Sequence, residues 1–135
     1  MRRVVLDASA VMSFFENRPG SELVEDLVSL AIRGERELSM SVVNWGEVFY
    51  SEWRMNGRDH ALRVEAEIAQ LPIEIVDANL ELARLAAELH AQHKLHYGDC
   101  FAVALGRIRK AAVATADKGF SEAQGLVDLL WVTGT

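Results

Sequence analysis

The sequence predicts an α/β fold, a three-layer α/β/α sandwich built around a mainly parallel central sheet. Short apolar segments with the character of buried strands alternate with amphipathic segments of ten residues or more, as expected where helices connect parallel strands. Half of the 135 residues are hydrophobic and a quarter are charged, without a repeat or a linker. We therefore expect residues 1–135 to form a single domain.

The first half of the chain contains two predicted strands, each followed by two helices. Pro72 and the turn Arg18–Pro19–Gly20 are typical helix boundaries, and Ser21 can cap the helix that starts there. The predicted elements, in order, are a strand at residues 2–6, helices at 8–17 and 21–34, a strand at 37–41, and helices at 42–56 and 59–71.

The second half continues the alternation with three strands and two helices. Asp77 is the expected cap of the first of these helices, and the second helix is amphipathic. The predicted elements are strands at residues 73–77, 111–117 and 129–132 and helices at 77–94 and 98–110.

The charge balance restricts how the protein could contact nucleic acid. Its net charge is −6 at pH 7, whereas a protein that binds mainly by neutralising phosphates should be basic. We therefore expect any contact with nucleic acid to be local, bridged by a metal ion or supplied partly by a partner protein.

The sequence also indicates the compartment in which the protein acts. No apolar run approaches the roughly 20 residues of a membrane-spanning helix, so no membrane association is expected. Arg2 and Arg3 precede apolar residues as in a signal peptide, but Asp7 and Glu16 interrupt the apolar region. The single cysteine, Cys100, excludes an internal disulfide and favours a cytoplasmic location.

Four carboxylates are predicted to lie at one edge of the sheet. Ligands of parallel α/β folds bind outside the carboxyl ends of the strands, and each helix that follows a strand begins at that edge. Asp7 and Asp117 directly follow apolar strands, Glu47 lies early in the helix after the second strand, and Asp99 opens the helix before the fourth strand. Each acid alone could be a helix cap or a strand end, but the four together favour a functional site.

The predicted cluster has the donor chemistry that a hard divalent cation requires. Carboxylates gathered at low dielectric repel one another unless a proton or a cation relieves the repulsion. Because none of the four residues is histidine or cysteine, the expected ion is Mg²⁺ or Mn²⁺. Ser9 and Thr115 each lie two residues from an aspartate, so their hydroxyls could orient a carboxylate or a water.

Four motifs, in the order VVLDASAV, NWGEVFY, HYGDCFAVALG and AVATADKGF, resemble those of the PIN-domain ribonucleases. The resemblance covers nearly the whole chain and is strongest to the VapC-like toxins of type II toxin–antitoxin systems. It implies a Rossmann-like PIN domain. It also implies that the metal-binding and catalytic acids of the family fall on Asp7, Glu47, Asp99 and Asp117, with Ser9 and Thr115 as supporting residues.

The resemblance implies an activity and partners as well. Family members are Mg²⁺- or Mn²⁺-dependent endoribonucleases that cut single-stranded regions of RNA, and homodimers are usual. A small antitoxin protein occludes the site. The alternative is a PIN-fold protein that binds or regulates a partner without catalysis, and the intact set of acids favours the nuclease.

The segment HAQHKLH places histidines at positions 90, 93 and 96. Residues at this spacing wind across a helix, so His90, His93 and His96 cannot all meet one zinc ion unless the helix ends between them. A helix end with histidines near its last carbonyl groups is the favoured interpretation.

Basic and aromatic residues outside the predicted site also have ordinary structural interpretations. The basic group near the end of the 98–110 helix is expected to complement the helix dipole, with phosphate contact as the alternative; it comprises Arg107, Arg109 and Lys110. The aromatic residues of the 42–56 helix are expected to form core or an interface rather than to stack on bases; they are Trp45, Phe49, Tyr50 and Trp53.

Overall fold

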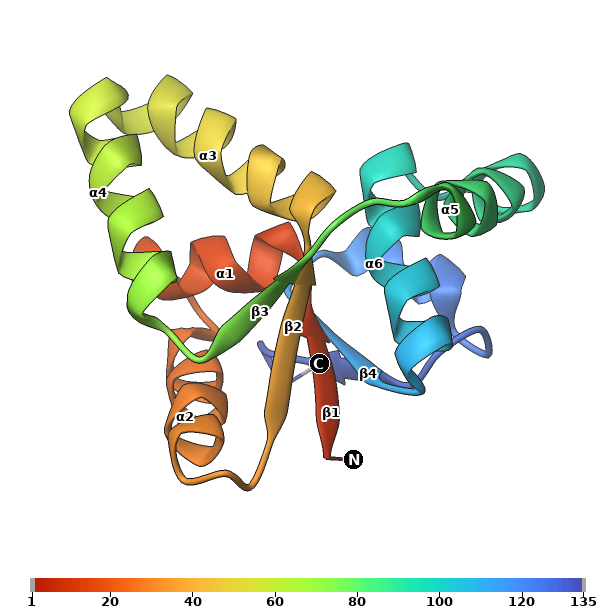
Figure 1. Cartoon of the computed structure of the whole chain (residues 1–135), viewed down its shortest axis with the longest axis horizontal. Coiled ribbons are helices and arrows are strands. Elements are labelled where there is room, and N and C mark those ends of the chain that lie inside the picture. Colours follow the sequence, from red (N-terminus) through yellow and green to blue (C-terminus); the bar gives the residue numbers. More distant parts are fainter. Residues whose placement is uncertain (1, 135) are drawn as a thin grey trace.

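A five-stranded, fully parallel sheet forms the centre of the protein (Figure 1). The computed structural model describes residues 2–134. The strands lie in the order β3-β2-β1-β4-β5; they are β1 (Arg3–Leu6), β2 (Glu37–Ser41), β3 (Ile73–Val76), β4 (Ala112–Thr115) and β5 (Leu129–Trp131). The helices are α1 (Ala8–Phe15), α2 (Ser21–Ile32), α3 (Val42–Asn56), α4 (Arg58–Gln70), α5 (Leu80–Gln92) and α6 (Tyr97–Arg109), with a 3₁₀ helix η1 (Lys118–Ala123).

Helices cover both faces of the sheet. The first four helices, coloured from red to yellow-green in Figure 1, lie on one side, and α5 and α6, coloured from green to blue, lie on the other. The predicted α/β fold class is therefore confirmed, and the sheet is parallel throughout rather than mainly parallel. Within residues 2–134, none of the helices combines the length and the apolarity that crossing a membrane would require.

Two predicted helix caps are wrong. Ser21 is the first residue of α2 and not its cap, because the chain enters this helix through Gly20 at a positive φ of 101°, without a side-chain cap. Asp77 does not cap α5, because residues 77–79 remain non-helical. Asn79 is the cap instead, and its side-chain oxygen accepts a hydrogen bond from the Leu82 backbone N–H at 2.9 Å.

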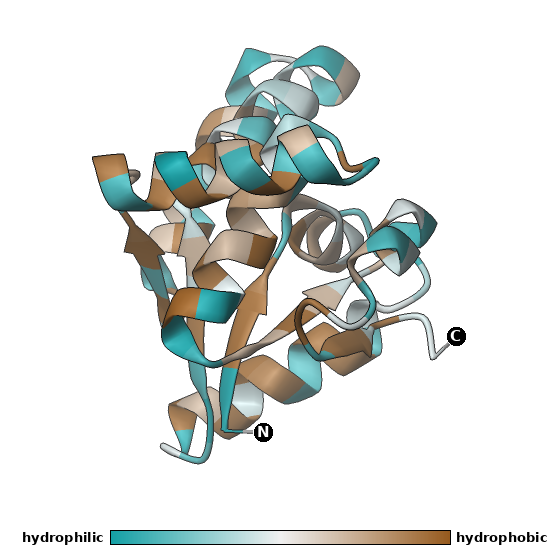
Figure 2. Cartoon of the chain, turned by 90° about the vertical axis from the view of Figure 1, so that its right-hand side faces the viewer, coloured by the Kyte–Doolittle hydropathy of each residue, from teal (hydrophilic) through white to brown (hydrophobic). Residues whose placement is uncertain are grey.

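The central strand β1 contributes to two separate hydrophobic cores. Val4 and Leu6 pack with the residues of α1 to α4, whereas Val5 points to the opposite face and packs with α5 and α6. Successive side chains of a strand alternate between faces, and β1 is buried on both. In Figure 2 the strands are predominantly brown, whereas the helices carry both hydrophilic and hydrophobic stretches.

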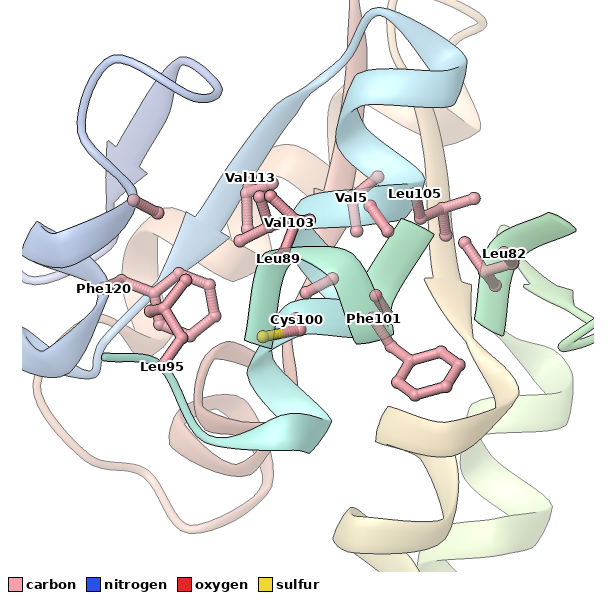
Figure 3. Close-up of a cluster of buried hydrophobic side chains, with 14 of the residues drawn as sticks. Val5, Leu82, Leu89, Leu95, Cys100, Phe101, Val103, Leu105, Val113 and Phe120 are labelled. Carbon is pink, nitrogen blue, oxygen red and sulfur yellow. The ribbon is translucent and has the colours of Figure 1, made fainter. Parts of the chain in front are cut away.

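Helix α6 is the most deeply buried helix of the second core. Its residues 100–106 are all buried, and Cys100 and Phe101 lie among the apolar side chains of Figure 3. A Cβ atom at Gly106 would lie 2.8 Å from a methyl carbon of Val113, so glycine lets α6 approach β4 closely. This packing holds the first turn of α6, and with it Asp99, near the carboxyl edge of the sheet.

The strand order defines where a ligand site is expected. The chain runs from β1 outward through β2 to β3 and then returns to add β4 and β5 on the other side of β1. The direction of winding therefore reverses between β1 and β4, and ligands of open α/β sheets bind outside the strands at such a switch point.

Candidate active site

Asp7 lies at the switch point and is almost completely buried, with 2% of its surface exposed. It follows β1 directly and caps α1, since its Oδ1 accepts a hydrogen bond from the Ala10 backbone N–H at 2.8 Å. The Ser9 hydroxyl lies 2.8 and 3.0 Å from its two oxygens, and the Thr115 hydroxyl donates to Oδ2 at 2.6 Å. Asp7 is thus a helix cap, but one that is buried and hydrogen-bonded on both carboxylate oxygens.

The two hydroxyl residues that support Asp7 also join the ends of β1 and β4. Ser9 Oγ accepts a hydrogen bond from the Ala116 backbone N–H at 2.8 Å, and Thr115 Oγ1 accepts one from the Asp117 N–H at 3.0 Å. The two hydroxyl oxygens lie 3.3 Å apart. Ser9 and Thr115 therefore make the contacts with an aspartate carboxylate that their spacing suggests.

Burial makes the ionised form of Asp7 unfavourable. Removal from water raises the pKa of Asp7 from 3.8 to about 7, although the hydrogen bonds from Thr115, Ala10 and Ser9 act in the opposite direction. The negative charge of Asp99 contributes further to the increase. At neutral pH this carboxyl group is therefore poised between its protonated and ionised forms.

Asp99 lies within electrostatic reach of the other three predicted acids. Burial, followed by the negative charges of Asp117 and Glu47, raises the pKa of Asp99 to about 6, although His96 acts in the opposite direction. Asp117 is half-buried and caps η1 by accepting a hydrogen bond from the Gly119 N–H at 2.9 Å. The structure therefore brings Asp7, Glu47, Asp99 and Asp117 together at one edge of the sheet.

Glu47 is positioned by two residues that sequence reasoning missed. The Asn44 side-chain amide donates to Glu47 Oε1 at 2.7 Å and to the Gly98 carbonyl oxygen at 2.9 Å, so it joins α3 to the start of α6. A Cβ atom at Gly98 would lie 2.7 Å from the Glu47 carboxyl carbon. Glycine at position 98 therefore leaves the space that the Glu47 carboxylate occupies.

The donor set suits a hard cation such as Mg²⁺ or Mn²⁺. The four acids offer only oxygen atoms, and their mutual repulsion is relieved when positive charge is added. The acids do not form a tight group, because among residues 2–134 only a different set, described below, has three donor atoms all within 4.8 Å of one another. Mg²⁺ keeps several water ligands, so an ion at this looser set would contact some of the carboxylates through water.

The three histidines lie around the end of α5, as predicted. His90 is in its last turn, His93 is its C-terminal cap, and His96 precedes α6. His90 Nδ1 lies 2.7 Å from the Leu95 carbonyl oxygen, and His96 Nδ1 lies 3.6 Å from Asp99 Oδ2. They do not form a common metal-ligand group in the described part of the chain.

The basic group at the end of α6 lies far from the acids. Arg109 pairs with Glu74 through two hydrogen bonds of 3.0 and 2.9 Å, and Arg107 donates to the Leu126 carbonyl oxygen at 2.8 Å. Arg3, at the start of β1, donates to the Arg109 carbonyl oxygen. Arg109 is therefore at the amino edge of the sheet, opposite Asp7, where it serves a structural role.

The fold and the four acids together define a class of protein. It is an α/β protein with an acidic ligand site at the switch point of its parallel sheet. Within this class, the chain belongs to the PIN-domain family, whose family model matches residues 4–126. No curated protein sequence matches the chain.

Solved structures of toxin–antitoxin systems share this fold over nearly the whole chain. VapBC2 from Rickettsia felis, bound to a DNA fragment from its promoter, superposes with a TM-score of 0.75 at 14% identity, covering 95% of this chain and 97% of that one. VapC20 from Mycobacterium tuberculosis, a toxin that cleaves the sarcin–ricin loop, gives 0.67 at 16% identity, with 93% and 98% covered. VapBC-5 from the same organism gives 0.66 at 19% identity, with 96% and 98% covered. The predicted resemblance to VapC-like PIN domains is confirmed.

Proposed function

We propose that this protein is a metal-dependent endoribonuclease and the toxin of a toxin–antitoxin pair, which hydrolyses phosphodiester bonds in single-stranded regions of RNA. The observation that carries the proposal is the state of Asp7. A carboxylate with 2% exposure and a pKa raised to about 7, beside a second acid with a raised pKa, is unfavourable for folding. Such perturbed groups cluster at functional sites.

The four acids have different roles in the proposed reaction. Asp7, Asp99 and Asp117 hold Mg²⁺ or Mn²⁺, directly or through water. When bound, the ion supplies positive charge beside the phosphate and lowers the pKa of water. Glu47, oriented by Asn44, completes the ligand set or accepts the proton of the attacking water. Ser9 and Thr115 keep the Asp7 carboxylate in place.

A local group of basic side chains explains how an acidic protein could bind RNA. A hollow beside Asp99 is lined by His93, Lys94 and His96. These side chains lie beside Asp99, so they can contact the phosphates that flank the cleaved bond even though the net charge is −6. Contact of this kind is local and does not require a basic protein.

We further propose that the protein acts in the cytoplasm as a homodimer and binds a small antitoxin. Two structural relatives are described as complexes, a toxin–antitoxin complex from Klebsiella pneumoniae and VapBC2 from Rickettsia felis. Helix α3 exposes three large apolar side chains, at 43% to 47% of their surface, which are suited to a protein contact; they are Tyr50, Trp53 and Met55.

Cleavage of cellular RNA by the purified chain tests the proposal. We expect cleavage with Mg²⁺ or Mn²⁺, none with a chelator, and none by Asp7→Asn, whose circular dichroism spectrum should match that of the wild type. Glu88→Gln, which changes an exposed acid on α5, is the matched control and should retain full activity. Mapping of the new 5′ ends would identify the target. Full activity of Asp7→Asn would refute the assignment, and absence of cleavage by the wild type would favour a non-catalytic binding protein.

A further inference from the structure

A second group of ionisable side chains lies away from the predicted acids, where α1, α3 and α4 meet. It consists of Glu16, which caps the end of α1, Glu52 of α3 and His60 of α4. Figure 1 shows α3 and α4 as a helical hairpin beside α1. We refer to these three residues as the helix-junction cluster.

The side chains of the helix-junction cluster converge on one point. His60 Nε2 lies 2.7 Å from Glu52 Oε1 and 3.6 Å from Glu16 Oε2. One donor atom from each residue lies within 4.8 Å of the other two, the arrangement that a shared metal ion needs. The Asn56 side-chain amide donates to Glu16 Oε2 at 3.2 Å and so fixes the orientation of that carboxylate.

One carboxylate oxygen of Glu52 is buried without a hydrogen-bond partner. The residue has 0% of its surface exposed, and its Oε2 has no hydrogen-bond partner among the described residues. The Glu52 carboxyl group lies within hydrogen-bonding reach of Glu16, and two carboxylates can only accept hydrogen bonds from each other if one carries a proton. A buried, unsatisfied carboxylate oxygen is strongly unfavourable, so either a proton or a cation must lie between them.

The third residue of the cluster indicates a cation. A histidine ligates a metal as the neutral imidazole, so this ligand set with two carboxylates would carry a charge of −2, which one divalent ion neutralises. Nitrogen and carboxylate oxygen donors together suit Zn²⁺ and similar transition metals, whereas Mg²⁺ prefers oxygen alone. The side chains of His60 and Glu16 are 28% and 20% exposed, which leaves a path by which an ion and a water ligand can enter from solvent.

We propose that Glu16, Glu52 and His60 form a second metal site, specific for a transition-metal dication of the Zn²⁺ class and separate from the acidic site at Asp7. A bound ion would add to the hydrogen bonds by which His60 and Asn56 already join these three helices. Two of these helices also lead to the predicted active site, since α1 starts after Asp7 and α3 carries Glu47. The expected effect is stabilisation of the helical layer that supports those acids.

Zinc retention by the full chain tests this site. The protein is stripped with a chelator, incubated with Zn²⁺ in an excess of Mg²⁺, and passed through a desalting column before elemental analysis. We expect the wild type to retain zinc in equimolar amount and to unfold at a higher temperature with zinc than without it. Asp99→Asn, which alters the acidic site, should retain the same zinc.

Ligand substitutions distinguish the helix-junction cluster from other zinc-binding side chains. His60→Gln and Glu52→Gln should each bind zinc at least about 100-fold more weakly, because even outer partners of metal ligands contribute about 10- to 100-fold. His93→Gln is the matched histidine control and should bind zinc as the wild type does. If Glu52→Gln fails to fold, Glu16→Gln, at a partly exposed position, replaces it.

Three results would overturn the proposal. Failure of the wild type to retain zinc, or equal retention by His60→Gln, would show that the cluster does not bind the ion. Loss of zinc binding in His93→Gln would show that the histidines around the end of α5, and not the helix-junction cluster, bind the ion. A Glu52→Gln variant that is more stable than the metal-free wild type, with no effect of zinc on either protein, would show that a shared proton links the two carboxyl groups.

Discussion

Thr115 donates a 2.6 Å hydrogen bond to the Oδ2 atom of Asp7, although the two residues are 108 positions apart in the chain. The bond is buried and joins the ends of the two strands at which the direction of winding reverses. Since Thr115 Oγ1 also accepts a hydrogen bond from the Asp117 N–H, one hydroxyl orients an aspartate from each strand end.

Thr115→Val should therefore weaken cation binding and destabilise the fold. Loss of the hydroxyl leaves the partly buried Asp117 N–H without this partner and removes a hydrogen bond that lowers the pKa of Asp7. We expect the free energy of unfolding to fall by about 1–3 kcal/mol and Mn²⁺ affinity at neutral pH to decrease. Denaturant titration and Mn²⁺ titration measure the two effects. Thr115→Ser, which keeps the hydroxyl, is the control, and equal Mn²⁺ affinity in the valine and serine variants would contradict the role given to this bond.

Without a divalent cation, stability should decrease as the pH rises. Below pH 3.8 Asp7 is protonated in both states; above it the unfolded chain loses the proton, whereas the folded protein keeps it up to about pH 7. The folded state is therefore favoured most at low pH, and this contribution is lost between about pH 4 and pH 7. The three-unit difference in pKa corresponds to about 4 kcal/mol. Asp99, with a pKa near 6, acts in the same direction.

Chemical denaturation in a chelating buffer at a series of pH values measures this dependence. Asp7→Asn should lack the Asp7 contribution and should be more stable than the wild type at pH 8. Addition of Mg²⁺ should restore stability to the wild type above pH 7 and leave Asp7→Asn nearly unchanged. A wild-type free energy of unfolding that rises from pH 4 to pH 7 in the chelating buffer would contradict the buried, protonated state of Asp7.

Two glycines in helices offer a matched pair of substitutions. A Cβ atom at Gly98 would overlap the Glu47 carboxylate, whereas a Cβ atom at Gly46 would meet nothing within 4 Å. Gly98→Ala should displace Glu47 and reduce RNA cleavage. Gly46→Ala should keep cleavage and stabilise α3 by about 0.5–1 kcal/mol, because alanine favours the helix. Cleavage assays and thermal unfolding of both variants check this, and an unchanged rate in Gly98→Ala would show that the position of Glu47 does not matter.

Arg109→Gln should leave RNA cleavage unchanged. Arg109 lies at the amino edge of the sheet and pairs with Glu74, which is 59% exposed. Because exposed ion pairs contribute little, we expect the free energy of unfolding to fall by about 1 kcal/mol or less. Initial cleavage rates and RNA affinity at two salt concentrations provide the measurement. A reduced salt dependence of RNA binding in the variant would restore the phosphate-contact interpretation.

The order of the elements was predictable because strands and helices differ in local periodicity. Asp7 and Asp117 follow apolar strands closely, so the rule that strand ends share an edge was enough to bring them together. The details of helix caps were less predictable. Whether Gly20 or Ser21 is the N-cap of α2 depends on a positive φ at glycine, which the surrounding chain imposes rather than the local sequence.

Contacts that a side chain makes with another helix could not be predicted from sequence patterns. Asn44 is three residues from Glu47, a spacing that permits contact on a helix, but its second bond, to the Gly98 carbonyl, spans 54 residues. The helix-junction cluster likewise depends on the packing of three helices. In the sequence of α3, Glu52 lies between aromatic residues. Nothing in the neighbouring sequence identifies its side chain as fully buried.

The central position of β1 determines when the acidic site can form during synthesis of the protein. Val5 of this first strand pairs with Val113, and the acids that accompany Asp7 extend to position 117. A ribosome makes β1 long before β4 (Ala112–Thr115), so β1 must wait until β4 has been made before both of its neighbours exist. A nascent chain that ends before Thr115 contains Asp7 but no complete acidic site. The order of translation thus delays the proposed nuclease until the residues up to Asp117 have been made.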